Sequence, residues 1–283
     1  MLNGFHLANR EFFAREVLDV APEILGCIIQ RTDDEGTVTI RITEVEAYAG
    51  ERDPGAHTYR GKTNRNKTMF GAAGHLYCYF TYGMHHALNL VAGQPGQPYG
   101  CLIRAGEVME GIDIARSRRQ SRPRKAPLLD ASLARGPACV AQSFGATLVN
   151  DGDDLFGGQW KFFVPDDGVV LPHRTGPRVG VSGPGGSATN FPWRYWLADE
   201  SSVSAYKPGR VEDEAGDQDG VRVPVGRLWP RGMKKVTIEG LVVTSLRPRV
   251  RPVGPLFQTR SDESNARLCR HRLAPCSQLN SQC

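Results

Sequence analysis

Several common signatures are missing from this sequence of 283 residues. Its seven cysteines include no CxxC pair, so neither a zinc ribbon nor a disulfide framework is indicated, and we expect a reducing compartment. No apolar run approaches the length that spans a bilayer, and the first residues, MLNGFHLANREFF, contain no basic segment followed by an apolar core. These absences predict a soluble cytoplasmic protein with no membrane partner.

Two frequent catalytic motifs are missing as well. Residues 180–184, GVSGP, do not fit the GxSxG pattern of a nucleophile elbow, and no GxxxxGK phosphate-binding loop occurs. The sequence also has no internal repeat. Hydrolases of the elbow type and P-loop nucleotide hydrolases are therefore not indicated.

Positive charge is distributed unevenly along the chain. The net charge is +5, yet residues 1–209 contain 22 basic and 22 acidic residues, whereas residues 210–283 contain 13 and 8. Two basic clusters, at 60–67 and 116–125, lie within the neutral part, and clusters of this kind suit phosphate groups. The change in composition predicts a folded domain over residues 1–208 and a basic, poorly ordered extension over residues 209–283.

Residues 37–48, TVTIRITEVEAY, are predicted to form the β-strand around which the domain is organised. The apolar residues at 38, 40 and 42 alternate with polar ones and therefore share one face. Continuing this alternation places Glu44, Glu46 and Tyr48 on the same apolar side. A carboxylate on a buried side is either paired with an arginine or functional, for example as a general base.

The remaining pattern predicts an α+β fold, a single mixed domain with a curved antiparallel β-sheet and flanking short helices. Helices are expected at 9–26, broken around Pro22, at 107–119, and at 137–144 directly after Gly136. Residues 49–74 are predicted to be a loop. The other expected strands are 27–30, 75–81 and 85–91 as a hairpin, 100–105, 160–164, 178–181, 193–197 and 236–243.

Three features carry candidate chemistry. They are the glutamate strand with His57 shortly after it, the tyrosine-rich hairpin, and Arg104 at the end of the strand 100–105. Tyr77 and Tyr79 share one face of the hairpin, and Tyr82 lies in its turn. Aromatic rings on a sheet give bases a stacking surface, and a ring at a protruding tip can wedge into a base stack. Each feature alone also has an ordinary explanation, such as an ion pair, a core ring or a surface ring.

Four segments carry a resemblance to a known family: EVEAYAGERDPGAH (44–57), RNKTMFGAAGHLYCYFTYGMHHALN (65–89), LIRA (102–105) and RGP (135–137). Taken together, they resemble the methylpurine-DNA glycosylase family, also called alkyladenine or 3-methyladenine DNA glycosylases. The resemblance covers residues 10 to about 200 in order, and several spaced motifs in register are more specific than any one of them. His85 and His86 depart from the bulky apolar or aromatic residues common in relatives.

The resemblance implies a role for each matching residue. Glu46 corresponds to the carboxylate that activates the hydrolytic water, and Arg104 to an arginine that helps to hold that water and the carboxylate. Tyr82 corresponds to the residue that enters the duplex in place of the extruded base. Asn89 corresponds to an asparagine that disfavours guanine by crowding its exocyclic amino group. The walls of the base pocket correspond to Tyr48, His57 and Tyr79.

The resemblance further implies a monofunctional DNA glycosylase of base excision repair. Such an enzyme flips alkylated or deaminated purines out of duplex DNA and hydrolyses the N-glycosidic bond, leaving an abasic site. A carboxylate below an oxocarbenium-like sugar can take a proton from water and stabilise positive charge. The expected partner is double-stranded DNA containing damaged purines. The protein is expected to be a monomer in the cytoplasm of a bacterial cell, associated with the nucleoid. No metal or organic cofactor is required.

Two other functions remain open at the level of sequence. Glu44, Glu46 and His57 are suitable ligands for the divalent ion of a metal-dependent nuclease. A non-catalytic DNA-damage binding module would use the tyrosines and tolerate loss of Glu46. Strand cleavage through a lysine Schiff base is not indicated, since Lys62 and Lys67 are the only lysines near the matching segments and lie in the predicted loop.

Overall fold

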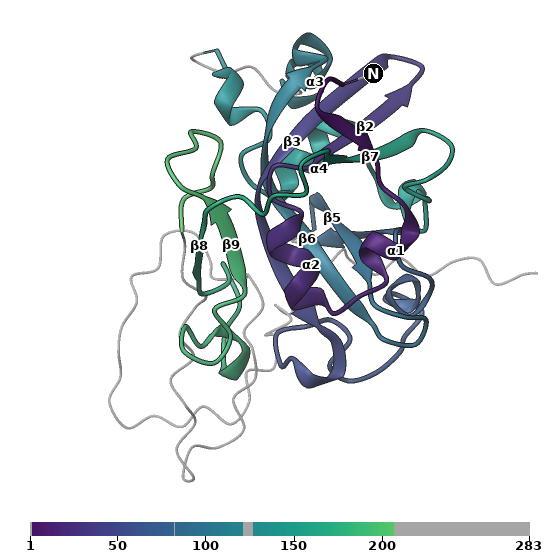
Figure 1. Ribbon diagram of the computed structural model, residues 1–283, viewed down its shortest axis with the longest axis vertical. Coiled ribbons are helices and arrows are strands. Elements are labelled where there is room, and N and C mark those ends of the chain that lie inside the picture. Colours follow the sequence, from purple (N-terminus) through teal and green to yellow (C-terminus); the bar gives the residue numbers. More distant parts are fainter. Residues whose placement is uncertain (1, 82, 121–126, 207–283) are drawn as a thin grey trace, which may run out of the picture. The chain divides into compact units, whose positions relative to one another are not determined.

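The structure is a computed structural model that describes residues 2–81, 83–120 and 127–206 (Figure 1). All of these residues belong to one compact unit, Met1–Gly216. The predictions for Tyr82, for the strand at 236–243 and for the extension at 209–283 lie outside the described residues.

A single antiparallel sheet forms the framework of the described unit, which confirms the predicted α+β class. Its main path runs β1-β7-β2-β3-β6-β5-β4, and β9 pairs with both β3 and β8. The predicted hairpins β2–β3 and β4–β5 are present. The strands are β1 Phe5–Leu7, β2 Ile28–Asp33, β3 Gly36–Ala49, β4 Leu76–Thr81, β5 His85–Ala92, β6 Tyr99–Glu110, β7 Trp160–Pro165, β8 His173–Gly176 and β9 Arg194–Leu197.

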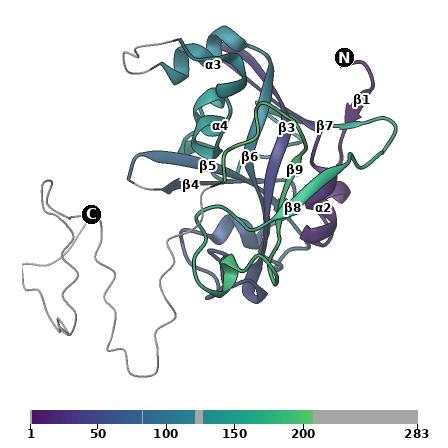
Figure 2. The same cartoon turned by 90° about the vertical axis from the view of Figure 1, so that its left-hand side faces the viewer.

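Short helices flank this sheet. They are α1 Arg10–Phe13, α2 Val17–Glu23, α3 Ile112–Arg119 and α4 Pro137–Phe144, with single 3-10 turns at Gly50–Arg52, Lys67–Phe70, Asp130–Ser132, Leu148–Asn150 and Pro184–Gly186. α4 has the predicted bounds: Pro137 supplies a preset φ at its first position, and Gly145 ends it at a φ of 65°. α2 packs on β3 and β6, and α3 packs against α4 (Figures 1 and 2).

Four predictions for these elements were wrong. The break between the first two helices precedes Val17, and Pro22 lies inside the last turn of α2. Residues 107–110 continue β6, because β3 is long enough to pair with them and Arg41 binds Glu107 at 2.8 Å. Residues 178–181 are not a strand, and β8 precedes them. β1 was not predicted.

The faces of β3 also differ from the predicted alternation. Ile42 pairs with Gly106 and Glu44 with Ala105, so the ladder shifts register and Thr43 has no partner in it. This β-bulge reverses the alternation. Val38, Ile40 and Ile42 therefore share the core face with Val45, Ala47 and Ala49, and all six belong to one hydrophobic cluster. The two glutamates and the tyrosine at 44, 46 and 48 face the other side. The expectation that they continue the apolar side was wrong.

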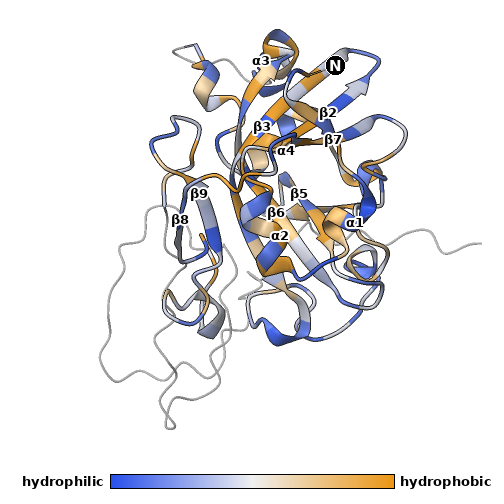
Figure 3. Cartoon of the chain, viewed as in Figure 1, coloured by the Kyte–Doolittle hydropathy of each residue, from blue (hydrophilic) through white to orange (hydrophobic). Residues whose placement is uncertain are grey.

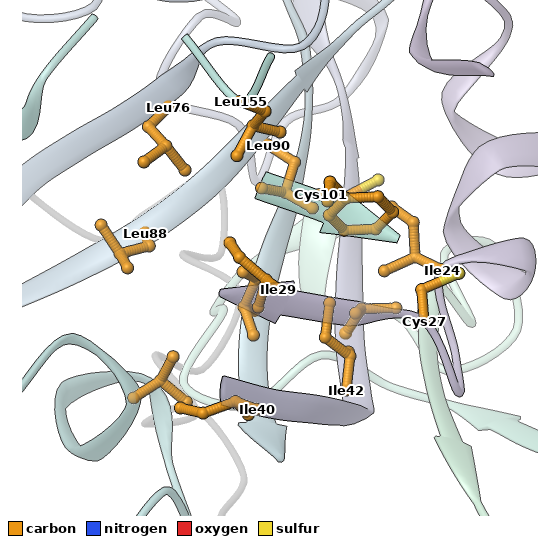
Figure 4. Packing of buried hydrophobic residues seen from close by; sticks show 14 of the residues in the cluster. Ile24, Cys27, Ile29, Ile40, Ile42, Leu76, Leu88, Leu90, Cys101 and Leu155 are labelled. Carbon is orange, nitrogen blue, oxygen red and sulfur yellow. The ribbon is translucent and has the colours of Figure 1, made fainter. Parts of the chain in front are cut away.

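The hydrophobic core lies within the bend of the sheet. Strands far apart in the strand order contribute to one cluster, since Ile29 of β2 belongs to the same cluster as Leu76 of β4 and Leu88 of β5 (Figure 4). The sheet must therefore curl around the core, although it does not close into a barrel. Apolar residues concentrate in the central strands, and polar residues in the connecting loops (Figure 3).

Candidate active site

A cavity of about 490 Å³ opens on the face of the sheet opposite the core. Its volume is within the range of roughly 300–1,000 Å³ that is typical of small-molecule sites. The wall is built from β3, β4, β5 and β6, the N-terminal end of α4, and the loops around residues 54–57 and 179–182. Among the seven predicted site residues, the six that the structure describes all line it: Glu46, Tyr48, His57, Tyr79, Asn89 and Arg104.

Strand register brings these residues together from distant parts of the sequence. Leu102 of β6 pairs with Glu46 of β3 on one side and with Asn89 of β5 on the other, and Asn89 pairs with Tyr77 of β4. Four side chains thus form one row across four strands. Tyr79 lies two positions further along β4, on the same face.

Glu46 is fully buried in the wall, where it accepts two hydrogen bonds and forms an ion pair. Its Oε1 accepts the backbone N–H of Val179 at 2.6 Å and lies 3.3 Å from Nη1 of Arg104. Its Oε2 accepts the hydroxyl of Tyr48 at 2.8 Å. Because an ionised carboxylate has about four acceptor positions, one position on Oε2 is left for a further donor.

Glu44 accepts more hydrogen bonds than Glu46 and does not line the cavity. Its two oxygens accept from Nε of Arg104 at 3.0 Å, Nε of Arg194 at 2.6 Å, and both the backbone N–H and the hydroxyl of Ser204 at 2.7 and 2.9 Å. Glu44 is therefore the counterion of two buried arginines. Burial opposes charge on Arg104, but the negative charges of Glu46 and Glu44 raise the pKa of its guanidinium above the ordinary value.

Aromatic rings line the wall across the cavity from these groups. Tyr77 and Tyr79 stack with their centroids 5.3 Å apart, and His57 meets Tyr79 edge-on at 4.7 Å. Burial, followed by the charge of Glu46, raises the pKa of the hydroxyls of Tyr48 and Tyr79, so both stay protonated. His57 lies at the exposed rim, where partial desolvation and then the charge of Arg65 lower its pKa. Neutral hydrogen-bonding groups and flat apolar surfaces thus face the cavity.

Three residues of the site were missed at the level of sequence. Arg178 is 1% exposed and donates to both oxygens of Asp53, at 2.5 and 2.7 Å, and Val179 follows it in the chain. Asp53 stands within the segment 44–57 that carries the resemblance, but nothing in the sequence pairs it with a residue 125 positions away. The expected strand at 178–181 concealed this connection.

The two basic clusters differ in their surroundings. Arg116 and Arg118 are already neutralised by carboxylates, for example Arg118 by Asp33 at 2.8 Å, which limits what the second cluster can offer to phosphate. Arg65 and Lys67 in the first cluster are exposed, and Cζ of Arg65 lies 5.8 Å from the centroid of the Tyr79 ring in the cavity wall. Over the described part of the chain, no group of three or more His, Cys, Asp or Glu side chains is arranged to hold a metal ion. No helix there is long and apolar enough to cross a membrane.

The chain is similar to known proteins over most of its described part. Residues 11–201 match the model of the family described as methylpurine-DNA glycosylase (MPG). A protein of Streptomyces avermitilis named "Putative 3-methyladenine DNA glycosylase" is 48% identical over 202 residues, which cover 70% of this chain and 91% of that relative. Proteins with the same name from Leifsonia xyli subsp. xyli and Burkholderia orbicola are 47% and 44% identical over 201 and 204 residues, with 70% and 71% of this chain and 92% and 93% of those relatives covered.

The fold and the comparisons define a hydrolase that acts on N-glycosyl bonds in DNA. The chain belongs to the methylpurine-DNA glycosylase family, which confirms the resemblance. It is a DNA glycosylase of the 3-methyladenine type and an enzyme of DNA repair, with DNA as its substrate.

Proposed function

We propose that this enzyme flips an alkylated or deaminated purine out of duplex DNA into the cavity and releases the base by attack of a water activated by Glu46. The reaction is monofunctional, leaves an abasic site and requires no metal. We further propose that the protein acts as a monomer, with residues 1–208 as the catalytic domain and residues 209–283 as a basic extension.

The observation that carries this proposal is the unequal use of the two glutamates. Glu44 accepts four hydrogen bonds from arginines and Ser204 and lies outside the cavity wall, whereas Glu46 accepts two, faces the cavity and retains one acceptor position on Oε2. A water bound there would give its proton to Glu46 as it attacks the sugar, and the carboxylate would stabilise the developing oxocarbenium ion.

The remaining walls suit an extruded purine. Tyr48, Tyr79 and His57 offer ring faces and edges, and a stacked base gains about 1–3 kcal/mol, which offsets the few kcal/mol that extrusion costs. Asn89 is 4% exposed and stands in the same row as Glu46, on the other side of Leu102, where its amide can meet a purine edge and disfavour guanine. Its placement supports selection by shape and hydrogen bonding, and Tyr82 is the proposed wedge.

The decisive experiment uses oligonucleotide duplexes with 3-methyladenine, 7-methylguanine, hypoxanthine or ethenoadenine, incubated in a chelator with the wild type and with Glu46→Gln. We expect full base release by the wild type and a loss of about 10²–10⁴-fold in the variant, the usual range for general acid–base catalysis. Binding of the lesion duplex by the variant should remain.

Three results would reject the proposal. Wild-type rates in Glu46→Gln would remove the catalytic role of Glu46 and favour another general base. Loss of activity in the chelator, with strand scission on adding back a divalent ion, would indicate the nuclease. A covalent DNA adduct trapped by borohydride would indicate a lysine Schiff base instead of water attack.

A further inference from the structure

Arg178 is a buried charge that the proposed reaction does not use directly. Its side chain and that of Asp53 are both fully buried. Four of its five N–H donors have partners: the two oxygens of Asp53, the carbonyl of Ala47 at 3.0 Å and the carbonyl of Gly185 at 2.8 Å. The guanidinium therefore joins three separate segments, residues 47–53 and the two ends of the loop 178–185.

Arg178 and its acceptor Ala47 both lie one residue away from the site. Ala47 stands in β3 between Glu46 and Tyr48, and Val179 donates its backbone N–H to Oε1 of Glu46 at 2.6 Å. The Cζ atom of Arg178 also lies 4.6 Å from the centroid of the Tyr48 ring. The pair with Asp53 thus holds the loop against the strand at the point where both touch the cavity.

The buried pair is not explained by stability alone. Well-packed apolar residues of similar volume are often as stabilising as a buried ion pair, because two charges must lose their hydration. An arginine adds planar, bidentate hydrogen bonding, which fixes the orientation of both the guanidinium and the carboxylate. Burial opposes its charge, but Asp53, the Tyr48 oxygen and Glu46 raise the pKa of Arg178, so the guanidinium is charged at all working pH values.

We infer that Arg178 and Asp53 are positioning residues that hold the Val179 N–H on Oε1 of Glu46 and the ring of Tyr48 against β3, so that Oε2 faces the reacting water. This role rests on the proposed function of Glu46. A donor fixed on Oε1 prevents rotation of the carboxyl group and favours its ionised form. Without that donor, the carboxyl group rotates more freely and loses an N–H that stabilises its negative charge.

The sharpest test removes the backbone N–H donor of Val179. Val179→Pro deletes the backbone N–H, and Val179→Ala, which keeps it, is the matched reference for the lost side chain. We expect kcat/KM for base release to be about 10- to 100-fold lower in Val179→Pro than in Val179→Ala, with the acid limb of its pH profile moved up by about one pH unit. The change should lie mainly in kcat rather than KM, because Val179 acts through Glu46.

A second pair of variants covers the case in which the proline disturbs folding. Arg178→Lys keeps the charge but loses the planar fork, and Arg31→Lys makes the same change elsewhere. Arg31 is a suitable control because it is 10% exposed, donates to the carbonyl of Phe144 at 2.6 Å and lies 5.4 Å from the ring of Trp160, outside the cavity. We expect the same shift of the acid limb in Arg178→Lys and an unshifted limb in Arg31→Lys, compared at equal fractions of folded protein.

The outcomes separate this inference from the proposed function. A wild-type acid limb and rate in folded Arg178→Lys, together with equal profiles for Val179→Pro and Val179→Ala, would overturn the positioning role. If Glu46→Gln is nevertheless inactive, the proposed function survives that failure. If Glu46→Gln retains the wild-type rate, the proposed function fails and the positioning role fails with it.

Discussion

The two glutamates of β3 lie two residues apart, and their environments predict opposite consequences for the same substitution. Glu44→Gln removes the shared counterion of Arg104 and Arg194, which are 6% and 4% exposed. It also turns an amide N–H₂ toward a donor, either the Ser204 N–H or an arginine. Breaking a buried ion pair costs about 3–5 kcal/mol. Since 1 kcal/mol shifts the Tm of a unit of this size by about 2–4 °C, the expected decrease is roughly 6–20 °C.

Glu46→Gln should be milder for stability. The carbonyl of the glutamine can still accept from Val179 and Arg104, and Arg104 keeps Glu44 as its counterion. Thermal unfolding followed by circular dichroism at pH 7.5, combined with base release measured well below both transitions, separates the effects. The reasoning is refuted if Glu44→Gln unfolds within about 2 °C of the wild type, or if Glu46→Gln is the less stable variant of the two.

Two further predictions follow from the pKa directions. The imidazole of His57 should titrate with a midpoint below pH 6.5 when followed by NMR, and Arg65→Gln should raise that midpoint by removing a nearby positive charge. A wild-type midpoint above pH 6.5 would contradict the lowering of the His57 pKa by desolvation and the charge of Arg65. Burial raises the pKa of Cys27 and Cys78 to about 12, and it also raises the pKa of Cys101. Iodoacetamide at pH 8 should therefore leave all three thiols unlabelled in the folded protein and label them in urea. Peptide mass mapping would detect the difference.

Local patterns in the sequence were sufficient for much of the fold. Alternation with turn residues identified the hairpin of β4 and β5, and Gly136-Pro137 marked the start of α4. The motifs shared with the family then identified the residues that line the cavity. These signals are local, or are learned from relatives, and neither requires knowledge of which distant segments meet.

Contacts between distant segments could not be predicted in the same way. The pairing of Arg178 with Asp53 joins positions 125 apart, and the alternation around residue 178 suggested a strand instead. The extension of β6 to Glu110 depends on the length of its partner β3. In both cases tertiary contacts decided the conformation, which propensity alone cannot express.

The β-bulge at Thr43 explains why one strand can serve both the core and the cavity. In unbroken alternation, residues 44, 46 and 48 would follow Ile42 into the hydrophobic cluster, where two carboxylates would lose their hydration without partners. The extra residue reverses the alternation, so that Val45 and Ala47 continue the core while Glu46 turns toward the cavity. Arg104 of β6 has no partner on β3 in the ladder between these two strands, which places a second irregularity beside the first. Bulges are frequent next to active sites because they redirect single side chains without ending the sheet, and here the paired irregularities point an arginine and two carboxylates at one another.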